Sequence, residues 1–262
     1  MSKVLLFDCD GVLGDSEQFG HLPAFNQMWR EQGVDWQWSV EEYGRKLAIG
    51  GGKERMKSLF ADRDFLAVCP HPGTEAKVDE IVAGWHRRKS EIYKEIILSG
   101  RIPARPGVKR LAEEAFAAGW TLGVCSTSKR PSVLAVLHCA MGEPLAGRFA
   151  LVIAGDEVPV KKPAPDIYLT AADRLGVTPA ECLVIEDSRN GLVAADRAGM
   201  RCLVTVSGYT RDEGFSEAAL VVSSLGDPGG DPVAVLANRS GATVGGWVTV
   251  ANLDQILAWD GG

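Results

Sequence analysis

Two aspartates two residues apart, Asp8 and Asp10, follow a short apolar run over Val4–Phe7 near the start of the chain. The apolar run is typical of a buried strand, and Gly11 lets the backbone turn where the strand ends. Both carboxylates can then converge at the carboxyl edge of a sheet, where open α/β folds bind ligands. Paired carboxylates suit Mg²⁺, which completes its coordination shell with phosphate oxygens and water. A strand that ends in a solvated acidic turn is equally compatible with this spacing alone.

Other polar residues that could act with these aspartates also follow apolar runs. Leu122–Cys125 is followed by Ser126, and Leu183–Ile185 is followed by Glu186 and Asp187. A Lys-Lys-Pro turn lies between the two segments. Taken alone, the acidic pair could simply cap the next helix, and the lysines could be solvated. Each of these segments alone is therefore weak evidence for a functional site.

Alternating strands and helices would position these groups. β-Branched and apolar runs recur at Val4–Phe7, Leu122–Cys125, Leu151–Ala154, Leu183–Ile185 and Cys202–Val206. Between them, helical patterns cover Val108–Ala118, Ser132–Cys139, Ile167–Leu175 and Gly191–Ala198. This alternation predicts a parallel sheet covered by helices on both faces.

The segment between the first strand and residue 100 does not continue this alternation, and its sequence pattern predicts mainly helices. Its predicted helices are Leu22–Gln32, Val40–Ala48, Lys53–Phe60 and Thr74–Ser99. We therefore expect a core formed by residues 1–15 and 101–262, with residues 16–100 as a separate helical domain. In the tail, residues 226–262, Trp247–Val250 suggests an edge strand, and Asn252 could cap a helix over Leu253–Leu257.

The four polar segments resemble, in order, the four motifs of the haloacid dehalogenase (HAD) superfamily. They are Asp8–Leu13, Leu122–Thr127, Lys161–Tyr168 and Leu183–Gly191. The resemblance spans roughly residues 3–226 and implies a Rossmann-like α/β core domain with an inserted α-helical cap domain of the C1 type. Asp10 favours phosphate chemistry, because true haloacid dehalogenases resemble this pattern without the second aspartate.

The resemblance also implies a role for each motif residue. Asp8 would be the nucleophile that forms an aspartyl-phosphate, and Asp10 the general acid and then the base. Ser126 and Thr127 would bind the phosphoryl group, and Lys162 would neutralise its charge. Mg²⁺ would be held by the Asp8 carboxylate, the Asp10 backbone carbonyl, Glu186 and Asp187.

Residues beside the second motif have alternative roles. Thr127 or Ser128 could cap the helix that Pro131 helps to start. Arg130 is a further candidate substrate residue.

Basic residues in the helical insert suggest that it binds a second phosphate, away from the one being cleaved. A glycine-rich turn leads into a helix that carries two cations, and amides at a helix N-terminus bind anions. The glycines alone are also compatible with a flexible loop, and Tyr43 with an ordinary half-buried aromatic. The expected substrate residues of the insert are Glu17, His21, Tyr43, Gly51, Gly52, Lys53, Arg55, His86 and Lys89.

Within the superfamily, the insert resembles the CbbY group, particularly at Asp15–Glu17, Val34–Trp38 and Gly51–Arg55. This implies a phosphatase that converts xylulose-1,5-bisphosphate, an inhibitor of Rubisco, to xylulose 5-phosphate. The runner-up is a mutase resembling β-phosphoglucomutase, which has the same cap type and catalytic set. A phosphate-binding protein without catalysis and a dehalogenase are the remaining alternatives.

Composition excludes several other classes of protein. Hydrophobic residues make up 46% of the 262-residue chain and charged residues 24%, as in an ordinary globular protein. A net charge of −6 disfavours nonspecific binding to nucleic acid or anionic membranes. The six scattered cysteines indicate a reducing compartment. We expect a cytoplasmic monomer, or a protein of the chloroplast stroma if a transit peptide has been removed.

Overall fold

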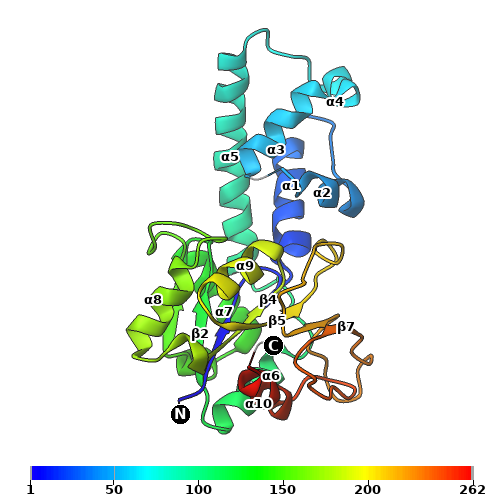
Figure 1. Ribbon diagram of the computed structural model, residues 1–262. Helices are drawn as coiled ribbons and strands as arrows, with labels where there is room; N and C mark the ends of the chain where they lie inside the picture. Colours follow the sequence, from blue (N-terminus) through cyan, green and yellow to red (C-terminus); the bar gives the residue numbers. More distant parts are fainter. Residues whose placement is uncertain (1, 50, 261–262) are drawn as a thin grey trace. The chain divides into compact units, whose positions relative to one another are not determined.

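The computed structural model describes residues 2–49 and 51–260 and divides into two compact units (Figure 1). One unit runs to Asp15 and resumes at Ile102, and the other is Ser16–Arg101. The second unit is therefore inserted into the first shortly after its first strand.

The first unit is built on a sheet with the strand order β3-β2-β1-β4-β5-β6-β7. All neighbouring strands pair in parallel except β6 and β7, which are antiparallel. The strands are β1 (Val4–Phe7), β2 (Thr121–Cys125), β3 (Leu151–Ile153), β4 (Cys182–Glu186), β5 (Arg201–Thr205), β6 (Leu220–Val222) and β7 (Val235–Asn238). The expected α/β fold with a parallel sheet is confirmed.

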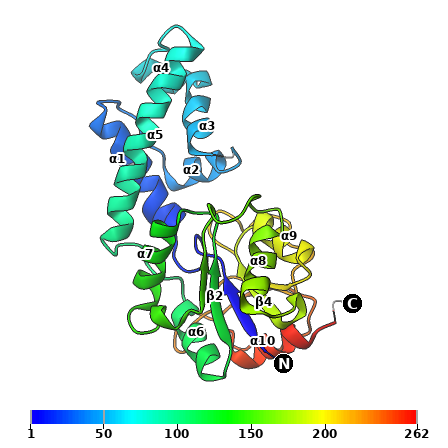
Figure 2. The same cartoon turned by 90° about the vertical axis from the view of Figure 1, so that its left-hand side faces the viewer.

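Helices cover both faces of this sheet (Figure 2). On one face, α8 (Asp166–Leu175) and α9 (Arg189–Arg197) pack against the strands and each other. On the other face lie α6 (Val108–Ala117), α7 (Arg130–Met141) and α10 (Val250–Ala258). Because both faces are covered, β1 is buried along its whole length, which explains its continuous apolar sequence. Short 3₁₀ turns at Ala146–Arg148 and Pro179–Glu181 complete the unit.

The second unit is helical, and no strand occurs among its described residues. Its longest helix, α5 (Glu75–Leu98), packs against α1 (Leu22–Glu31) and α3 (Gly52–Lys57). Aromatic rings fill much of its interior, with Trp38 in edge contact with both Phe25 and Trp29. The remaining elements are a π-helical turn at Glu17–His21, α2 (Val40–Lys46), a 3₁₀ turn at Ser58–Ala61 and α4 (Arg63–Val68).

Three local predictions are wrong. Trp247–Val250 is not a strand, because Thr249 caps α10 and the helix begins at Val250. Asn252 is not the cap itself but the third residue of that helix, and it completes a capping box with Thr249. Neither Thr127 nor Ser128 caps α7, whose N-cap is Lys129 without a side-chain hydrogen bond.

Membrane-spanning helices were also searched for. None of the helices in residues 2–49 and 51–260 has the length and apolar character needed to cross a bilayer.

Candidate active site

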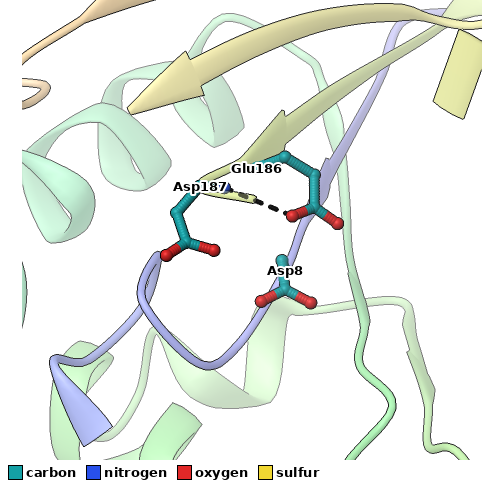
Figure 3. Close-up of side chains that lie close together, drawn as sticks. All are labelled: Asp8, Glu186 and Asp187. Atoms are coloured by element: carbon teal, nitrogen blue, oxygen red, sulfur yellow. Dashed lines mark hydrogen bonds between the residues drawn. The ribbon is translucent and has the colours of Figure 1, made fainter. Parts of the chain in front are cut away.

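The carboxyl ends of three neighbouring strands bring the central polar residues together. Asp8 follows β1, Ser126 follows β2, Glu186 ends β4 and Asp187 follows it. Phe7 is level with Val124 and Ile185 in the parallel register, so the next residues leave the sheet at one edge. Figure 3 shows Asp8, Glu186 and Asp187 with their carboxylates directed toward a common space.

Gly11 makes this convergence possible. Its φ of +84° is readily adopted only by glycine, and it lets the chain turn after Asp10. A Cβ at this position would lie 2.1 Å from Oδ2 of Asp187. Any side chain here would therefore displace the acid at the end of β4.

Lys162 links two of the acids from the loop before α8. Its Nζ lies 2.6 Å from both Asp8 Oδ1 and Glu186 Oε1, and it donates to the carbonyl of Cys125 at 2.8 Å. Burial disfavours the charged ammonium, but the carboxylates of Asp8 and Glu186 outweigh this and raise the pKa of Lys162. Lys162 is therefore a fixed cation beside Asp8, and its role in neutralising a phosphoryl group stays a prediction.

Burial disfavours simultaneous ionisation of the acids in this cluster. It raises the pKa of Asp8 to about 7 although Lys162 lowers it, and the charges of Glu186 and Asp10 add to the rise. Burial, then the charges of Asp8 and Glu186, raise the pKa of Asp187 well above its usual range. One ammonium does not compensate three buried carboxylates, so the cluster favours a further cation.

The donor set fits a hard divalent cation such as Mg²⁺. One carboxylate oxygen from each of Asp8, Glu186 and Asp187 lies within 4.8 Å of the others, and all three residues are buried. Oxygen donors with open positions for water and phosphate are the ligands that Mg²⁺ prefers. Gly191 lets α9 approach the cluster, because a Cβ there would lie 1.9 Å from the Glu186 carboxyl carbon.

Asp10 lies beside the hydroxyl-rich loop after β2. Ser128 Oγ donates to Asp10 Oδ2 at 2.5 Å, and the Ser128 amide donates to Ser126 Oγ at 3.1 Å. Ser128 thus binds the predicted general acid and the predicted phosphoryl ligand simultaneously, which explains why it does not cap α7. Thr127, between the two serines, is exposed.

Arg130 has partners elsewhere in the first unit. Its guanidinium pairs with Glu157 at 2.8 Å and donates to the carbonyl of Val152 at 2.9 Å. Glu157 also pairs with Arg174. These contacts tie the start of α7 to the loop after β3, and a substrate role for Arg130 stays a prediction.

Most of the substrate residues predicted in the insert are joined by contacts within the second unit. Tyr43 donates to Glu17 at 2.5 Å, and Arg55 donates to the Tyr43 hydroxyl at 3.3 Å. Nζ of the buried Lys89 lies 2.5 Å from His21 Nδ1. These contacts join residues from three helices and the turn before α1.

This cluster has an excess of positive charge. Burial, then the charges of Lys89, Arg55 and His86, lower the pKa of His21 well below its usual range. Gly52 lies against His86, because a Cβ added to Gly52 would be 3.3 Å from the imidazole ring. Gly51 has a φ of +92° and precedes α3, while Lys53 is exposed.

Sequence analysis missed Tyr168, which contacts the acidic cluster from α8. Its buried hydroxyl donates to Glu186 Oε1 at 2.6 Å, and its ring lies 5.0 Å from Lys162 Nζ. Tyr168 therefore holds the same oxygen that pairs with Lys162. The only available signal was its place six residues after that lysine, on the inner face of α8.

We expect Tyr168→Phe to weaken metal activation more than folding. Glu186 would lose one of its two donors at Oε1, so the Mg²⁺ concentration for half-maximal activity should rise about 10-fold or more. Steady-state rates across a Mg²⁺ series would measure this, with thermal unfolding of the same samples as the control. An unchanged Mg²⁺ dependence would mean that Tyr168 does not position Glu186.

The buried acids also predict how the stability of the EDTA-treated protein depends on pH. Asp8 titrates near pH 7 in the folded state but near its ordinary value of 3.8 when unfolded. The folded state therefore binds more protons between these values, and the free energy of unfolding should fall as pH rises from about 4 to 7. Each such group contributes about 1.4 kcal/mol per pH unit.

Asp187→Asn provides the matched test, because it removes one of these acids without changing side-chain size. The melting temperature should fall less steeply from pH 5 to pH 8 in the variant than in the wild type. Excess Mg²⁺ should reduce the wild-type decline, since metal binds the deprotonated carboxylates. Equal slopes in both proteins without metal would contradict the expectation.

Comparison with known proteins identifies relatives over most of the chain. The model for haloacid dehalogenase-like hydrolases matches residues 2–199. A "CBBY-like protein" of Arabidopsis thaliana is 45% identical over 87% of this chain and 70% of its own length. A crystal structure of CbbY from Rhodobacter sphaeroides with phosphate has a TM-score of 0.68 and 39% identity, covering 86% of this chain and 95% of that one.

A second crystal structure of the same bacterial protein is equally similar. It is a mutant in complex with xylulose-1,5-bisphosphate, with a TM-score of 0.68 and 38% identity over the same shares of both chains. The resemblance to the CbbY group inferred from the insert and the four motifs is confirmed.

Proposed function

Because the chain belongs to the haloacid dehalogenase-like hydrolases, we propose that it is a Mg²⁺-dependent phosphatase that converts xylulose-1,5-bisphosphate to xylulose 5-phosphate. The strongest support is the convergence of Asp8, Glu186 and Asp187 with Lys162 at one sheet edge. The complex of the related CbbY with xylulose-1,5-bisphosphate supports this substrate in particular.

In the proposed first step, an Asp8 carboxylate oxygen attacks phosphorus and forms an aspartyl-phosphate. The bond to the sugar oxygen breaks, and Asp10 donates the proton that this leaving oxygen needs. Lys162, already paired with Asp8, lies where it can also neutralise phosphoryl oxygens. Ser126 supplies a buried hydroxyl at the end of the neighbouring strand.

In the second step, Asp10 removes a proton from water, which attacks phosphorus and releases inorganic phosphate and free Asp8. Mg²⁺, held by Asp8, Glu186 and Asp187, would reduce the repulsion between the anionic nucleophile and the phosphoryl group. The backbone carbonyl of Asp10 remains the proposed fourth protein ligand.

The second unit is proposed to be the cap, which binds the phosphate that is not transferred. Arg55, Lys89, His21 and His86 form a basic cluster, and the exposed Lys53 lies on α3 with Arg55. Glu17 and Tyr43 would bind sugar hydroxyls, with their mutual hydrogen bond fixing both side chains.

A panel of pentulose and hexose phosphates tests the proposed function. Released inorganic phosphate and isomerised sugar phosphate would be measured in the same reactions. We expect release of one phosphate from xylulose-1,5-bisphosphate at the highest kcat/KM of the panel. Sugar isomers formed without net phosphate release would instead indicate a mutase, and no reaction with any sugar phosphate would contradict the proposal.

Lys53→Ala should raise KM for the bisphosphate by about 10-fold or more, because a charge-assisted hydrogen bond to the distal phosphate is lost. KM for p-nitrophenyl phosphate, which has no second phosphate, should change little. Lys89→Ala should behave similarly, and Lys94→Ala, which alters an exposed lysine of the same helix α5, is the matched control. Equal effects on both substrates would exclude a distal-phosphate site.

A further inference from the structure

A polar cavity lies in the first unit, beyond the ends of β5 and β6. Its volume is about 420 Å³, within the range of small-molecule sites. Its polar lining comprises Arg105, Ser207, Gly208, Arg211, Ser223 and Ser224. None of the proposed catalytic residues lines this cavity, and neither does any acidic residue.

Arg105 is held at the cavity by the end of β5, with a longer contact to the carbonyl of Ser223 after β6. Its Nη2 donates to the carbonyl of Val206 at 2.7 Å and to Thr205 Oγ1 at 3.0 Å. Its Nε is buried without a hydrogen-bond partner among the described residues. Asp187 and Asp15 act on the guanidinium through longer-range electrostatics, but neither forms an ion pair with it. The charge is therefore fixed in place without a carboxylate to neutralise it directly.

Arg211 adds a second positive charge to the same cavity. It lies in the loop between β5 and β6, is exposed, and has no ion-pair partner in the part of the chain that the structure describes. Ser224 also lines the cavity and forms no hydrogen bond through its hydroxyl within the described residues. In contrast, the Ser207 hydroxyl already bonds to Thr210 and to Asp187 of the acidic cluster, and the Ser223 hydroxyl accepts from the amide of Ala234.

We propose that this cavity is a second anion site, which binds the phosphate group of inorganic phosphate or of a small phosphorylated metabolite. Two guanidinium groups that line one cavity suit an oxyanion, because Arg211 can donate parallel hydrogen bonds to two oxygens while Arg105 contributes a fixed positive charge. Arg105 supplies the preorganised charge, and Arg211 supplies one that can close on the ligand. Binding at this site requires neither Mg²⁺ nor turnover.

The test measures phosphate bound to the full-length protein with Mg²⁺ present. Equilibrium dialysis with radioactive inorganic phosphate should detect two sites on the wild type and one on Arg211→Glu, or at least a tenfold weaker second site. Arg63→Glu changes the net charge equally at an exposed position of the other unit and should retain both. Unchanged binding by Arg211→Glu would overturn the proposal.

Crystals soaked in tungstate would locate the sites independently. A wild-type peak between Arg105 and Arg211 that disappears in Arg211→Glu is the expected result, and a peak near Lys162 would serve as an internal control. Tungstate near Lys162 alone, or at neither place, would contradict the proposed second site. Whether or not the active site binds tungstate, the peak at the two arginines decides this proposal by itself.

Competition then distinguishes the two sources of the phosphate group. Ribose 5-phosphate that displaces radioactive phosphate from the second site at a lower concentration than unlabelled phosphate would identify an organic phosphate as the ligand. Equal or weaker displacement would identify inorganic phosphate. Failure of both to displace the label would overturn the assignment of a phosphate site.

Discussion

Asp8→Asn should reduce turnover of the sugar bisphosphate on the order of 10⁴-fold or more, because the amide cannot act as the nucleophile. Asparagine has almost the same shape as aspartate, so the packing beneath β1 should survive. The rate of inorganic phosphate release would measure the loss. A fraction of the wild type quenched during turnover should carry one phosphoryl group, detectable by mass spectrometry, and the variant none.

The same substitution should stabilise the EDTA-treated protein, which separates loss of chemistry from loss of fold. Asp8 is buried and shares Lys162 with Glu186, so its removal relieves repulsion among three acids. The melting temperature without metal should therefore rise at pH 7.5. A variant that lost activity and also melted earlier would have failed by unfolding, and substantial residual turnover would rule out Asp8 as the nucleophile.

The location of the site could be predicted because strand geometry places it. Asp8, Ser126 and Glu186 each follow or end a short apolar strand, and parallel strands deliver such residues to one edge. Lys162 comes from a loop, whose path has no periodicity, so only resemblance indicated its role. Tyr168 was missed because a tyrosine on an apolar helix face looks like an ordinary core residue until its hydroxyl partner is known.

The tail shows where local propensity misleads. Val248-Thr249-Val250 is β-branched and favours a strand, but Thr249 and Asn252 form a capping box that starts α10. The actual edge strand, β7 (Val235–Asn238), is exposed throughout. It therefore has no alternation of apolar and polar residues that could have predicted it, and its pairing with β6 depends on tertiary structure.

The cluster of polar residues in the second unit (Glu17, His21, Tyr43, Arg55 and Lys89) could be predicted as a set of residues, but the contacts among them could not. Helical periodicity relates His86 to Lys89 within α5, since they are three residues apart. Nothing comparable relates Tyr43 to Glu17, which are 26 residues apart and meet through a side-chain hydrogen bond. Such pairs depend on how α1, α2 and α5 pack around the aromatic interior.

Asp10→Asn should separate the two chemical steps, because they depend differently on the leaving group. A sugar oxygen needs a proton as it departs, so turnover of the bisphosphate should fall by about 10²–10⁴-fold. p-Nitrophenolate leaves without a proton, and Asp8 should still attack at nearly its normal rate. Asparagine cannot accept a proton from water, so the phosphoenzyme should then accumulate.

Rapid-mixing measurements would detect this as a burst of one nitrophenolate per active site followed by slow turnover. Wild type should show a much smaller burst relative to its steady-state rate. With the bisphosphate, the variant should show no burst of the sugar monophosphate product, because formation of the phosphoenzyme is slowed as well. Equal losses on both substrates without a burst would mean that Asp10 does not transfer protons.

Ser128→Ala provides the matched control, because it removes the hydrogen bond to Asp10 Oδ2 but leaves the carboxylate. A positioned acid that loses its orientation retains part of its activity, so we expect a loss nearer 10-fold on the bisphosphate and no burst with the aryl phosphate. A loss as large as that of Asp10→Asn would mean that the serine contributes more than orientation. The difference between the two variants therefore measures proton transfer separately from the position of the group that performs it.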